Sequence, residues 1–329
     1  MPTEGLLHAA GLGTVHDSNC RTPRHADKTA FRADSESDSN APHSEPQTPT
    51  LLSPQSWVTV VACPGGRSLS SEGIGEMTAV FAVVAAAASE TGLVRRNNED
   101  AAYSGRWLFA VADGMGGHAA GEVASAAVIE SLRTHDTDVG AGALLEVLGH
   151  AVTQANAEVA RRAAEDPARF GMGTTLTAML WSGNTVALVH IGDSRAFRLR
   201  HGRLRQITED HVLGNLVSNA GPLAPVLSRY LDGRPDRSPD LGLRELRTGE
   251  RYLICSDGLS PVVSDEAIGA VLAATADPAD AVHELVALAE EAGGPDNVSV
   301  IVIDVRDPDV DSGPAEPVTL GAAAAAVTR

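Results

Sequence analysis

Hydrophobic positions along this chain follow two periods. Apolar residues recur at every third or fourth position in four stretches, which predicts helices over residues 118–133, 144–164, 265–275 and 278–292. Shorter apolar or alternating runs predict strands over residues 78–89, 106–112, 171–183, 241–246 and 251–255, two or three more within 184–208, and a last one after residue 297. The pair His201-Gly202 marks a hairpin turn within the 184–208 segment. The pattern predicts a sheet-rich α+β fold in which the two long early helices cover one face of a sheet.

Three segments lack this pattern. Residues 1–76 are rich in Ser, Thr, Pro, Asp and His, which predicts a disordered N-terminal extension, although residues 57–62 form a brief apolar island without an obvious partner. We hypothesise that Met77 is the start of translation, because recognisable structure begins directly after it. Glycines and prolines in residues 209–240 predict a mobile surface segment with one or two short helices. We therefore expect one folded domain over 77–306 and a disordered tail over 307–329.

Aspartates stand where loops meet the predicted strands. They are Asp100, Asp113, Asp193, Asp257 and Asp296, and glycine flanks or nearly flanks most of them. A single aspartate of this kind is usually a turn residue or a helix cap. Several carboxylates brought together repel one another and raise one another's pKa, and cations remove that cost. Carboxylates with backbone carbonyls and water are ligands of Mg²⁺ or Mn²⁺ rather than of zinc.

Composition narrows the class of partner. The chain has 329 residues, is 43% hydrophobic and carries a formal net charge of −18, which argues against nucleic acid or an anionic membrane surface as its partner. Cys20, Cys63 and Cys255 have no metal or redox spacing, so we expect a reduced, cytoplasmic protein. The apolar run 79–88 is too short to cross a bilayer, and it has no basic region before it that would suggest a secretory signal.

Six motifs resemble, in the correct order, the metal-dependent Ser/Thr protein phosphatases of the PPM or type 2C family, especially its bacterial branch. They are RRNNEDA, FAVADGMGGHAAGEVAS, GMGTTLTAML, HIGDSRAFRL, YLICSDGLS and GGPDNVSVIV, and the likeness covers roughly residues 78–305. The resemblance implies two antiparallel β-sheets packed as a central sandwich flanked by helices on both sides (αββα). Residues 77–306 would then be a PPM-type phosphatase domain.

The resemblance also implies metal ligands. Asp113 would bridge two metal ions, and the carbonyl of Gly114 would bind one of them. Asp257 and Asp296 would complete the coordination of the first ion. The ions would be Mn²⁺ or Mg²⁺.

Further roles follow from the same motifs. Glu99 and Asp100 match an early acidic pair that supports the second ion directly or through water. Asp193 resembles a ligand of the third, weaker ion of bacterial members, with Asp257 near it. Arg95 matches the arginine that grips the substrate phosphate.

The implied activity is hydrolysis of phosphoserine and phosphothreonine. A hydroxide shared by the two ions would attack phosphorus in line, without a phosphoenzyme, while Arg95 orients the phosphoryl group. The expected partners are phosphorylated proteins, namely Ser/Thr kinases and their substrates, and not nucleic acid or membrane. We expect a monomer. Cys255 lies in an apolar strand without a phosphate-cradling loop after it, so we interpret it as a core residue.

Departures from the family pattern leave an alternative open. Met115 stands where some members carry a histidine proposed as the general acid, and His118 is either a substitute for it or a helix-capping residue. The 209–240 segment looks shorter than usual and lacks a His-Pro element, and Pro261 replaces a usual acidic residue. The alternative is a catalytically weak regulatory or phosphoprotein-binding module on the same fold. A metal nuclease is disfavoured by the net charge.

Overall fold

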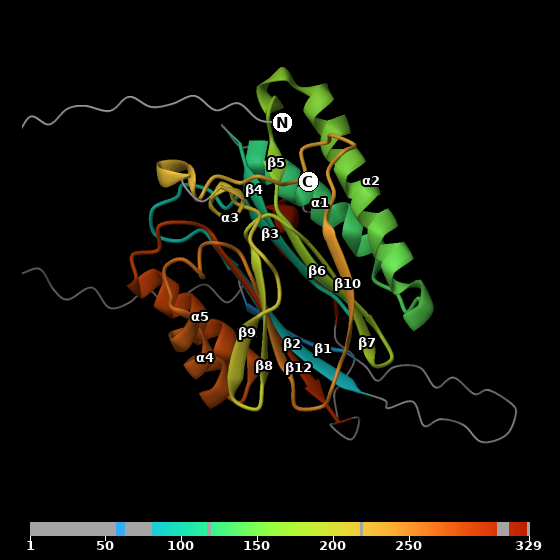
Figure 1. Ribbon diagram of the computed structural model, residues 1–329, viewed down its shortest axis with the longest axis vertical. Coiled ribbons are helices and arrows are strands. Elements are labelled where there is room, and N and C mark those ends of the chain that lie inside the picture. The colour runs from blue at the N-terminus through green and yellow to red at the C-terminus, as the bar shows by residue number, and fades with distance from the viewer. Residues whose placement is uncertain (1–56, 63–80, 117–119, 218–219, 308–315, 328–329) are drawn as a thin grey trace, which may run out of the picture. The chain divides into compact units, whose positions relative to one another are not determined.

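Two antiparallel β-sheets pack face to face in the computed structural model, which describes residues 57–62, 81–116, 120–217, 220–307 and 316–327 (Figure 1). In order across the first sheet, the strands are β1 (Trp57–Ala62), β2 (Ala82–Glu90), β12 (Val298–Arg306), β11 (Arg251–Cys255), β8 (Arg195–Arg200) and β9 (Arg203–Gln206). In order across the second, they are β10 (Asp240–Glu245), β7 (Thr185–Ile191), β6 (Leu176–Ser182), β4 (Leu108–Met115), β3 (Asp100–Ser104) and β13 (Val318–Gly321), with β5 (Gly173–Thr174) paired to β4.

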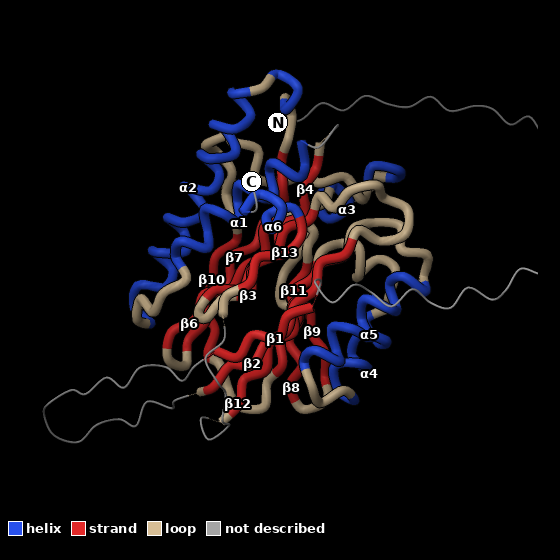
Figure 2. The backbone as a smooth tube through the Cα atoms, turned by 180° about the vertical axis from the view of Figure 1, so that it is seen from behind, coloured by secondary structure: helices blue, strands red, loops and turns tan. Residues whose placement is uncertain are grey.

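Helices cover the outer face of each sheet. The α-helices are α1 (Ala120–Leu132), α2 (Leu144–Glu165), α3 (Leu213–Leu216), α4 (Asp265–Ala274), α5 (Pro278–Glu291) and α6 (Ala322–Val327). Helices α1 and α2 lie on the second sheet, and α4 and α5 lie on the first (Figure 1). Figure 2 shows α6 and β13 beside α1 and β3. The predicted αββα sandwich is confirmed. No helix in the described part of the chain is long and apolar enough to cross a membrane.

Strand alternation divides the core into two layers. On β12, Ile301 and Ile303 join the large cluster that lies between the sheets and extends under α1 and α2. Their neighbours Val300 and Val302 point the other way and pack with α4 and α5. Because side chains of a strand alternate between faces, a continuous apolar strand such as β12 serves both layers at once.

Two described elements fall in segments for which composition predicts disorder. Residues 57–62 form β1, which pairs with β2 from Trp57↔Ala88 to Ala62↔Val83. Residues 318–321 form β13, which pairs with β3 and leads into α6. The prediction of disorder is wrong for these elements, because each is an edge strand whose partner lies elsewhere in the sequence. Met77 and most of the predicted extension lie outside the described residues.

Arg251 joins the inner strands of the first sheet to the turn between α4 and α5. Its Nε and Nη2 donate to the two carboxylate oxygens of Asp304 at 2.5 and 2.9 Å. It also donates to the carbonyls of Leu272 and Ala276, at 2.9 and 2.8 Å, and to that of Thr275. One guanidinium therefore satisfies a buried carboxylate and several carbonyls at the end of α4.

His190 gives the fold an acid-sensitive point. It is 2% exposed, its Nε2 donates to the Glu209 carbonyl at 2.9 Å, and its Nδ1 lies 2.9 Å from the Thr177 hydroxyl. Burial, with the neighbouring His211, lowers the pKa of His190 to about 4 from its ordinary value of 6.5. In the unfolded chain His190 is therefore protonated below pH ~6.5, whereas in the folded chain it is protonated only below pH ~4.

We expect His190 to lower stability as the pH falls through this window. The full contribution is present above pH ~6.5, and about 3 kcal/mol is lost by pH ~4. Urea unfolding of the wild type and of His190→Gln at several pH values between 7.5 and 4.5 checks this. The difference between the two curves isolates His190 from other titrating groups, and parallel curves would contradict the assignment.

Candidate functional site

A cavity of about 300 Å³ opens where several strand ends of the two sheets meet. Its lining residues are Arg95, Glu99, Asp113, Gly114, Met115, Gly116, Thr175, Asp193, Leu227, Asp257 and Asp296. All but one of the predicted site residues line it. The exception is Asp100, which is 1% exposed and lies beneath the cavity.

Asp100 and Asp113 are direct cross-strand partners on β3 and β4. The hydroxyl of Ser256 donates to Asp100 Oδ2 at 2.7 Å, and the Ser299 N–H donates to Ser256 Oγ at 2.9 Å. Gly114 follows, where a Cβ would lie 2.2 Å from the Gly121 carbonyl oxygen. Register therefore places the two carboxylates side by side, and only glycine fits at position 114 of β4.

The loop bearing Arg95 and Glu99 is fastened by Asn297. The side-chain amide of Asn297 donates to the carbonyls of Thr91 and Asn97, each at 2.9 Å, and its Oδ1 accepts from the Glu99 N–H at 2.8 Å. Asn297 directly precedes the first residue of β12. One buried side chain thus sets where this loop stands relative to the adjacent Asp296.

Asp257 and Asp296 come from neighbouring strand ends. Asp257 follows β11, Asp296 precedes β12, and these strands are paired. A Cβ at Gly258 would lie 1.9 Å from the Asn297 carbonyl oxygen, so the turn after Asp257 packs directly against the lip of β12. Asp296 Oδ2 accepts from Arg95 Nη2 at 2.6 Å, which holds the guanidinium at the cavity.

Thr175 connects Asp113 to the turn that carries Asp193. Its hydroxyl accepts from the Asp113 N–H at 3.0 Å and lies 2.8 Å from the Ser194 hydroxyl. Its own N–H donates to the Asp113 carbonyl at 2.9 Å. The sequence places Asn297 with Asp296 at the start of the last strand, but no role was predicted for Asn297 or Thr175. Both residues lie within the quoted motifs, next to glycine-containing turns, and this position was the one feature of the sequence that could have indicated a role.

Electrostatics oppose full ionisation of the carboxylates. Burial, followed by the charges of Asp100 and Asp257, raises the pKa of Asp113 well above its ordinary value. Burial raises the pKa of Asp100 to about 7 against the hydrogen bond from Ser256, and burial with Asp257 raises that of Asp193 to about 7. Burial also raises the pKa of Asp257. The cavity therefore gathers more carboxylates than its one guanidinium, that of Arg95, can neutralise.

This donor set fits hard divalent cations. Carboxylates, backbone carbonyls and a hydroxyl are all oxygen ligands, which Mg²⁺ and Mn²⁺ prefer. Within the described ranges, no three Asp, Glu, His or Cys side chains are grouped tightly enough to hold one ion by themselves. The carboxylates instead surround the cavity, an arrangement that leaves coordination positions to carbonyls and water.

The departures noted in the sequence have different outcomes. Met115 lines the cavity, whereas His118 lies outside the described residues. Leu227, from the irregular 209–240 segment, also lines the cavity, so this segment borders the site. Pro261 is exposed, and Cys255 is fully buried with its pKa raised to about 12 by burial, as expected for a core thiol.

Comparison with known proteins gives consistent matches. Residues 94–291 match the protein phosphatase 2C family model. The chain is 47% identical over 247 residues to the serine/threonine protein phosphatase PstP of Mycobacterium tuberculosis, covering 72% of this chain and 47% of PstP. The chain thus spans about half the length of that relative. It is 31% identical over 241 residues to the protein phosphatase PhpP of Streptococcus pneumoniae, covering 68% of this chain and 98% of PhpP.

A solved structure agrees in fold. The catalytic domain of PstP in complex with 2 manganese ions matches with a TM-score of 0.65 and 49% identity, over 68% of this chain and 99% of that domain. This chain belongs to the protein phosphatase 2C family.

Proposed function

We propose that this chain is a metal-dependent phosphatase that hydrolyses phosphoserine and phosphothreonine in proteins. The observation that carries the proposal is the cavity itself, where carboxylates from separate strand ends meet beside one guanidinium. The family membership and the manganese-bound PstP domain support the same reaction.

The residues divide into two sets. Asp113, Gly114, Asp257 and Asp296 would hold two Mn²⁺ or Mg²⁺ ions, with Asp193 directed to a third. Glu99 stands at the same cavity, and Asp100 supports Asp113 from beneath. Bound divalent ions supply a water acidic enough to react near neutral pH and offset charge on the phosphoryl oxygens.

Arg95 is the proposed phosphate-binding residue. Its guanidinium is about half exposed at the cavity, and its bond to Asp296 holds one edge in place. The remaining N–H groups can donate to two phosphoryl oxygens at once, which fixes the orientation of the phosphorus atom. Met115 and Leu227 add apolar surface to the wall of the cavity.

Replacing Arg95 tests this role. We expect Arg95→Ala to lower kcat/KM for a phosphothreonine peptide by about 10- to 100-fold, mainly through KM, because charge-assisted hydrogen bonds are lost. Arg96→Ala is the matched control, since Arg96 is an exposed neighbour that does not line the cavity. Equal effects of the two changes would refute the assignment of Arg95.

The finer biological assignment is also a proposal. We propose that the substrates are bacterial Ser/Thr kinases and their phosphorylated targets, met in the cytoplasm by a monomeric enzyme. The relatives named serine/threonine protein phosphatase PstP and protein phosphatase PhpP support this class of substrate. Light scattering for mass, and dephosphorylation of an autophosphorylated kinase, test the two parts separately.

A phosphoprotein-binding module is the competing function. Met115 in place of a titratable side chain, and the irregular segment that brings Leu227 to the cavity, favour it. Binding of a phosphothreonine peptide without turnover at saturating Mn²⁺ would establish it, whereas efficient turnover would remove it.

A further inference from the structure

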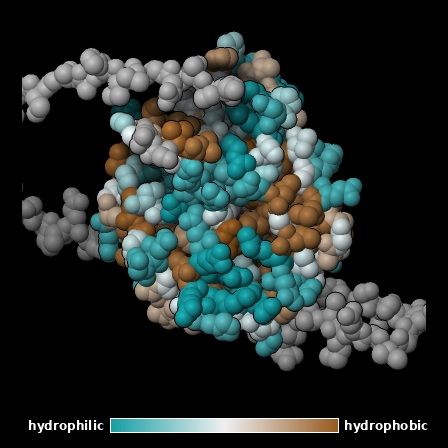
Figure 3. Space-filling model, viewed as in Figure 1, coloured by the Kyte–Doolittle hydropathy of each residue, from teal (hydrophilic) through white to brown (hydrophobic). Residues whose placement is uncertain are grey.

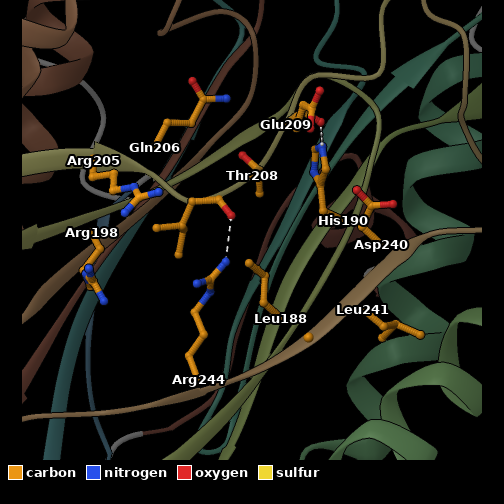
Figure 4. A pocket seen from close by; sticks show the side chains of 12 residues that line it. Leu188, His190, Arg198, Arg205, Gln206, Thr208, Glu209, Asp240, Leu241 and Arg244 are labelled. Carbon is orange, nitrogen blue, oxygen red and sulfur yellow. Dashed lines mark hydrogen bonds between the residues drawn. The ribbon is translucent and has the colours of Figure 1, made fainter.

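A second cavity, of about 410 Å³, lies between the β8–β9 hairpin of one sheet and the β7–β10 edge of the other (Figure 4). Its lining residues are Leu188, His190, Arg198, Arg205, Gln206, Ile207, Thr208, Glu209, Asp240, Leu241, Gly242 and Arg244. None of them lines the catalytic cavity. Figure 3 shows hydrophilic residues over the β8–β9 hairpin and hydrophobic residues over β10. We call this second cavity the arginine pocket.

Because side chains alternate between the faces of a strand, two arginines of the β8–β9 hairpin point into the arginine pocket. Phe197 and Leu199 pack in the cluster with α4 and α5, so Arg198 between them points to the opposite face, between the sheets. Arg205 is the direct cross-strand partner of Arg198. Two like charges directly opposite each other in an antiparallel pair destabilise the sheet.

A third arginine comes from the other sheet. Arg244 lies on β10, two residues after Gly242, so both share one face of that strand. A Cβ on Gly242 would meet nothing within 4 Å, which leaves this wall of the arginine pocket open. Figure 4 shows Arg198 and Arg205 on one side and Arg244 below them, whereas Glu209 and Asp240 lie at the opposite end.

The three guanidinium groups are poorly matched by protein acceptors. Within the part of the chain that the structure describes, the Arg205 side chain has no hydrogen bond or ion pair. Arg198 approaches Glu250 only to 3.9 Å, and Arg244 donates to the Ile207 carbonyl at 3.0 Å. The Nε atoms of Arg198 and Arg244 are both buried without a partner.

Asp240, which lines the arginine pocket, and Glu250, which lies near Arg198, do not correct this imbalance. Asp240 accepts from Arg229 Nη1 at 2.9 Å and lies 3.2 Å from His211 Nε2. Glu250 already accepts from the Tyr252 hydroxyl at 2.8 Å and from Arg200. Buried, unpaired N–H groups of charged side chains are costly, and a bound anion removes that cost.

We propose that the arginine pocket is a non-catalytic binding site for a phosphate group. Guanidinium groups from both sheets can surround a compact dianion and donate to several of its oxygens, and the Thr208 hydroxyl adds a neutral donor. The phosphate can be the free ion released by hydrolysis or a second phosphorylated residue of a substrate. Both sources present the same oxygens. Binding would also join the two sheets at their open edge.

Titration calorimetry of the manganese-loaded protein with inorganic phosphate tests the proposal. We expect two binding events in the wild type. Arg205→Gln should weaken one of them by about tenfold or more, because a charge-assisted interaction is lost, and leave competitive inhibition by phosphate unchanged. Gly242→Glu, which keeps every arginine and places a carboxylate in the open wall, should remove the same event.

Arg203→Gln is the matched control, because Arg203 is an exposed arginine on the same strand that does not line the arginine pocket. A single event in the wild type, abolished by Arg95→Ala, would overturn the proposal, as would equal weakening by Arg203→Gln and Arg205→Gln. A repeat with a peptide carrying two phosphothreonines distinguishes the sources. If Arg205→Gln raises KM for this peptide but not for its singly phosphorylated form, the ligand is a substrate phosphate. If it changes only the binding of inorganic phosphate, the ligand is the free ion.

Discussion

Asp113→Asn is expected to lower kcat for p-nitrophenyl phosphate and for a phosphothreonine peptide by about a thousandfold or more. Asp113 is the carboxylate on which the cavity converges, since it pairs with Asp100 in register and contacts Thr175 through its main chain. An amide keeps the shape of the side chain but loses the charge that holds divalent ions. Removal of metal with a chelator should inactivate the wild type to the same degree, and added Mn²⁺ should restore only the wild type.

In the metal-free protein, the same substitution should increase stability although it abolishes activity in the metal-loaded protein. Asp113→Asn removes a carboxylate whose ionisation is opposed by burial and by Asp100 and Asp257, so the free energy of unfolding should rise by the order of 1 kcal/mol at pH 7.5. Asp265→Asn, at an exposed position in the first turn of α4, should change neither quantity. Full activity in Asp113→Asn, or its loss together with the fold, would contradict the proposed role.

Asp304→Ala is expected to lower the free energy of unfolding by about 3–5 kcal/mol, because it leaves the buried Arg251 guanidinium without its counter-charge. Arg251 is 8% exposed and Asp304 7% exposed, so water cannot replace the lost interaction well. Urea unfolding of the manganese-free protein gives the measurement. Turnover per folded molecule should be retained, since neither residue lines the cavity that holds the proposed metal ligands.

Two further variants separate the pair from its surroundings. Arg306→Ala removes the second, more exposed arginine on Asp304 and should cost less than about 1 kcal/mol. The double change Arg251→Met with Asp304→Leu should cost less than the sum of the single changes, because no charge is left alone in the core. A cost of Asp304→Ala as small as that of Arg306→Ala would show that the pair is solvated.

The residues of the candidate site could be predicted to lie at strand ends because their signal is local. Asp113 and Asp257 each follow an apolar strand and precede a glycine, so their chemistry and their place at a strand end are visible in a few residues. The hairpin at His201 was predictable for the same reason, and its φ of 50° beside Gly202 at 72° confirms the turn. The resemblance to a family then supplied the arrangement of the sheets, which no single segment encodes.

Features that depend on distant partners could not be predicted in this way. Nothing near Asn297 indicates that its side chain would hold the loop before Glu99, and nothing near Thr175 indicates the backbone of Asp113 as its partner. Strands β1 and β13 lie in polar, proline-containing surroundings, and their pairing becomes apparent only once the sheet edges are known. The arginine pocket likewise follows from register, since Arg198 and Arg205 are opposed only when β8 and β9 are paired.

Strand β13 bears on where the folded domain ends. Gly321 lies so close to β3 that a Cβ at this position would be 2.2 Å from the Asp100 carbonyl oxygen. A chain cut after residue 306 would keep every proposed ligand, yet it would uncover the N–H and carbonyl groups of β3 next to the carboxylates of the candidate site. Such an open edge invites pairing with other molecules. Shortened forms made for biochemical work should therefore keep residues 316–327. If a shorter form aggregates, the cause would be the lost pairing of β13 with β3 and not low stability of the rest of the domain.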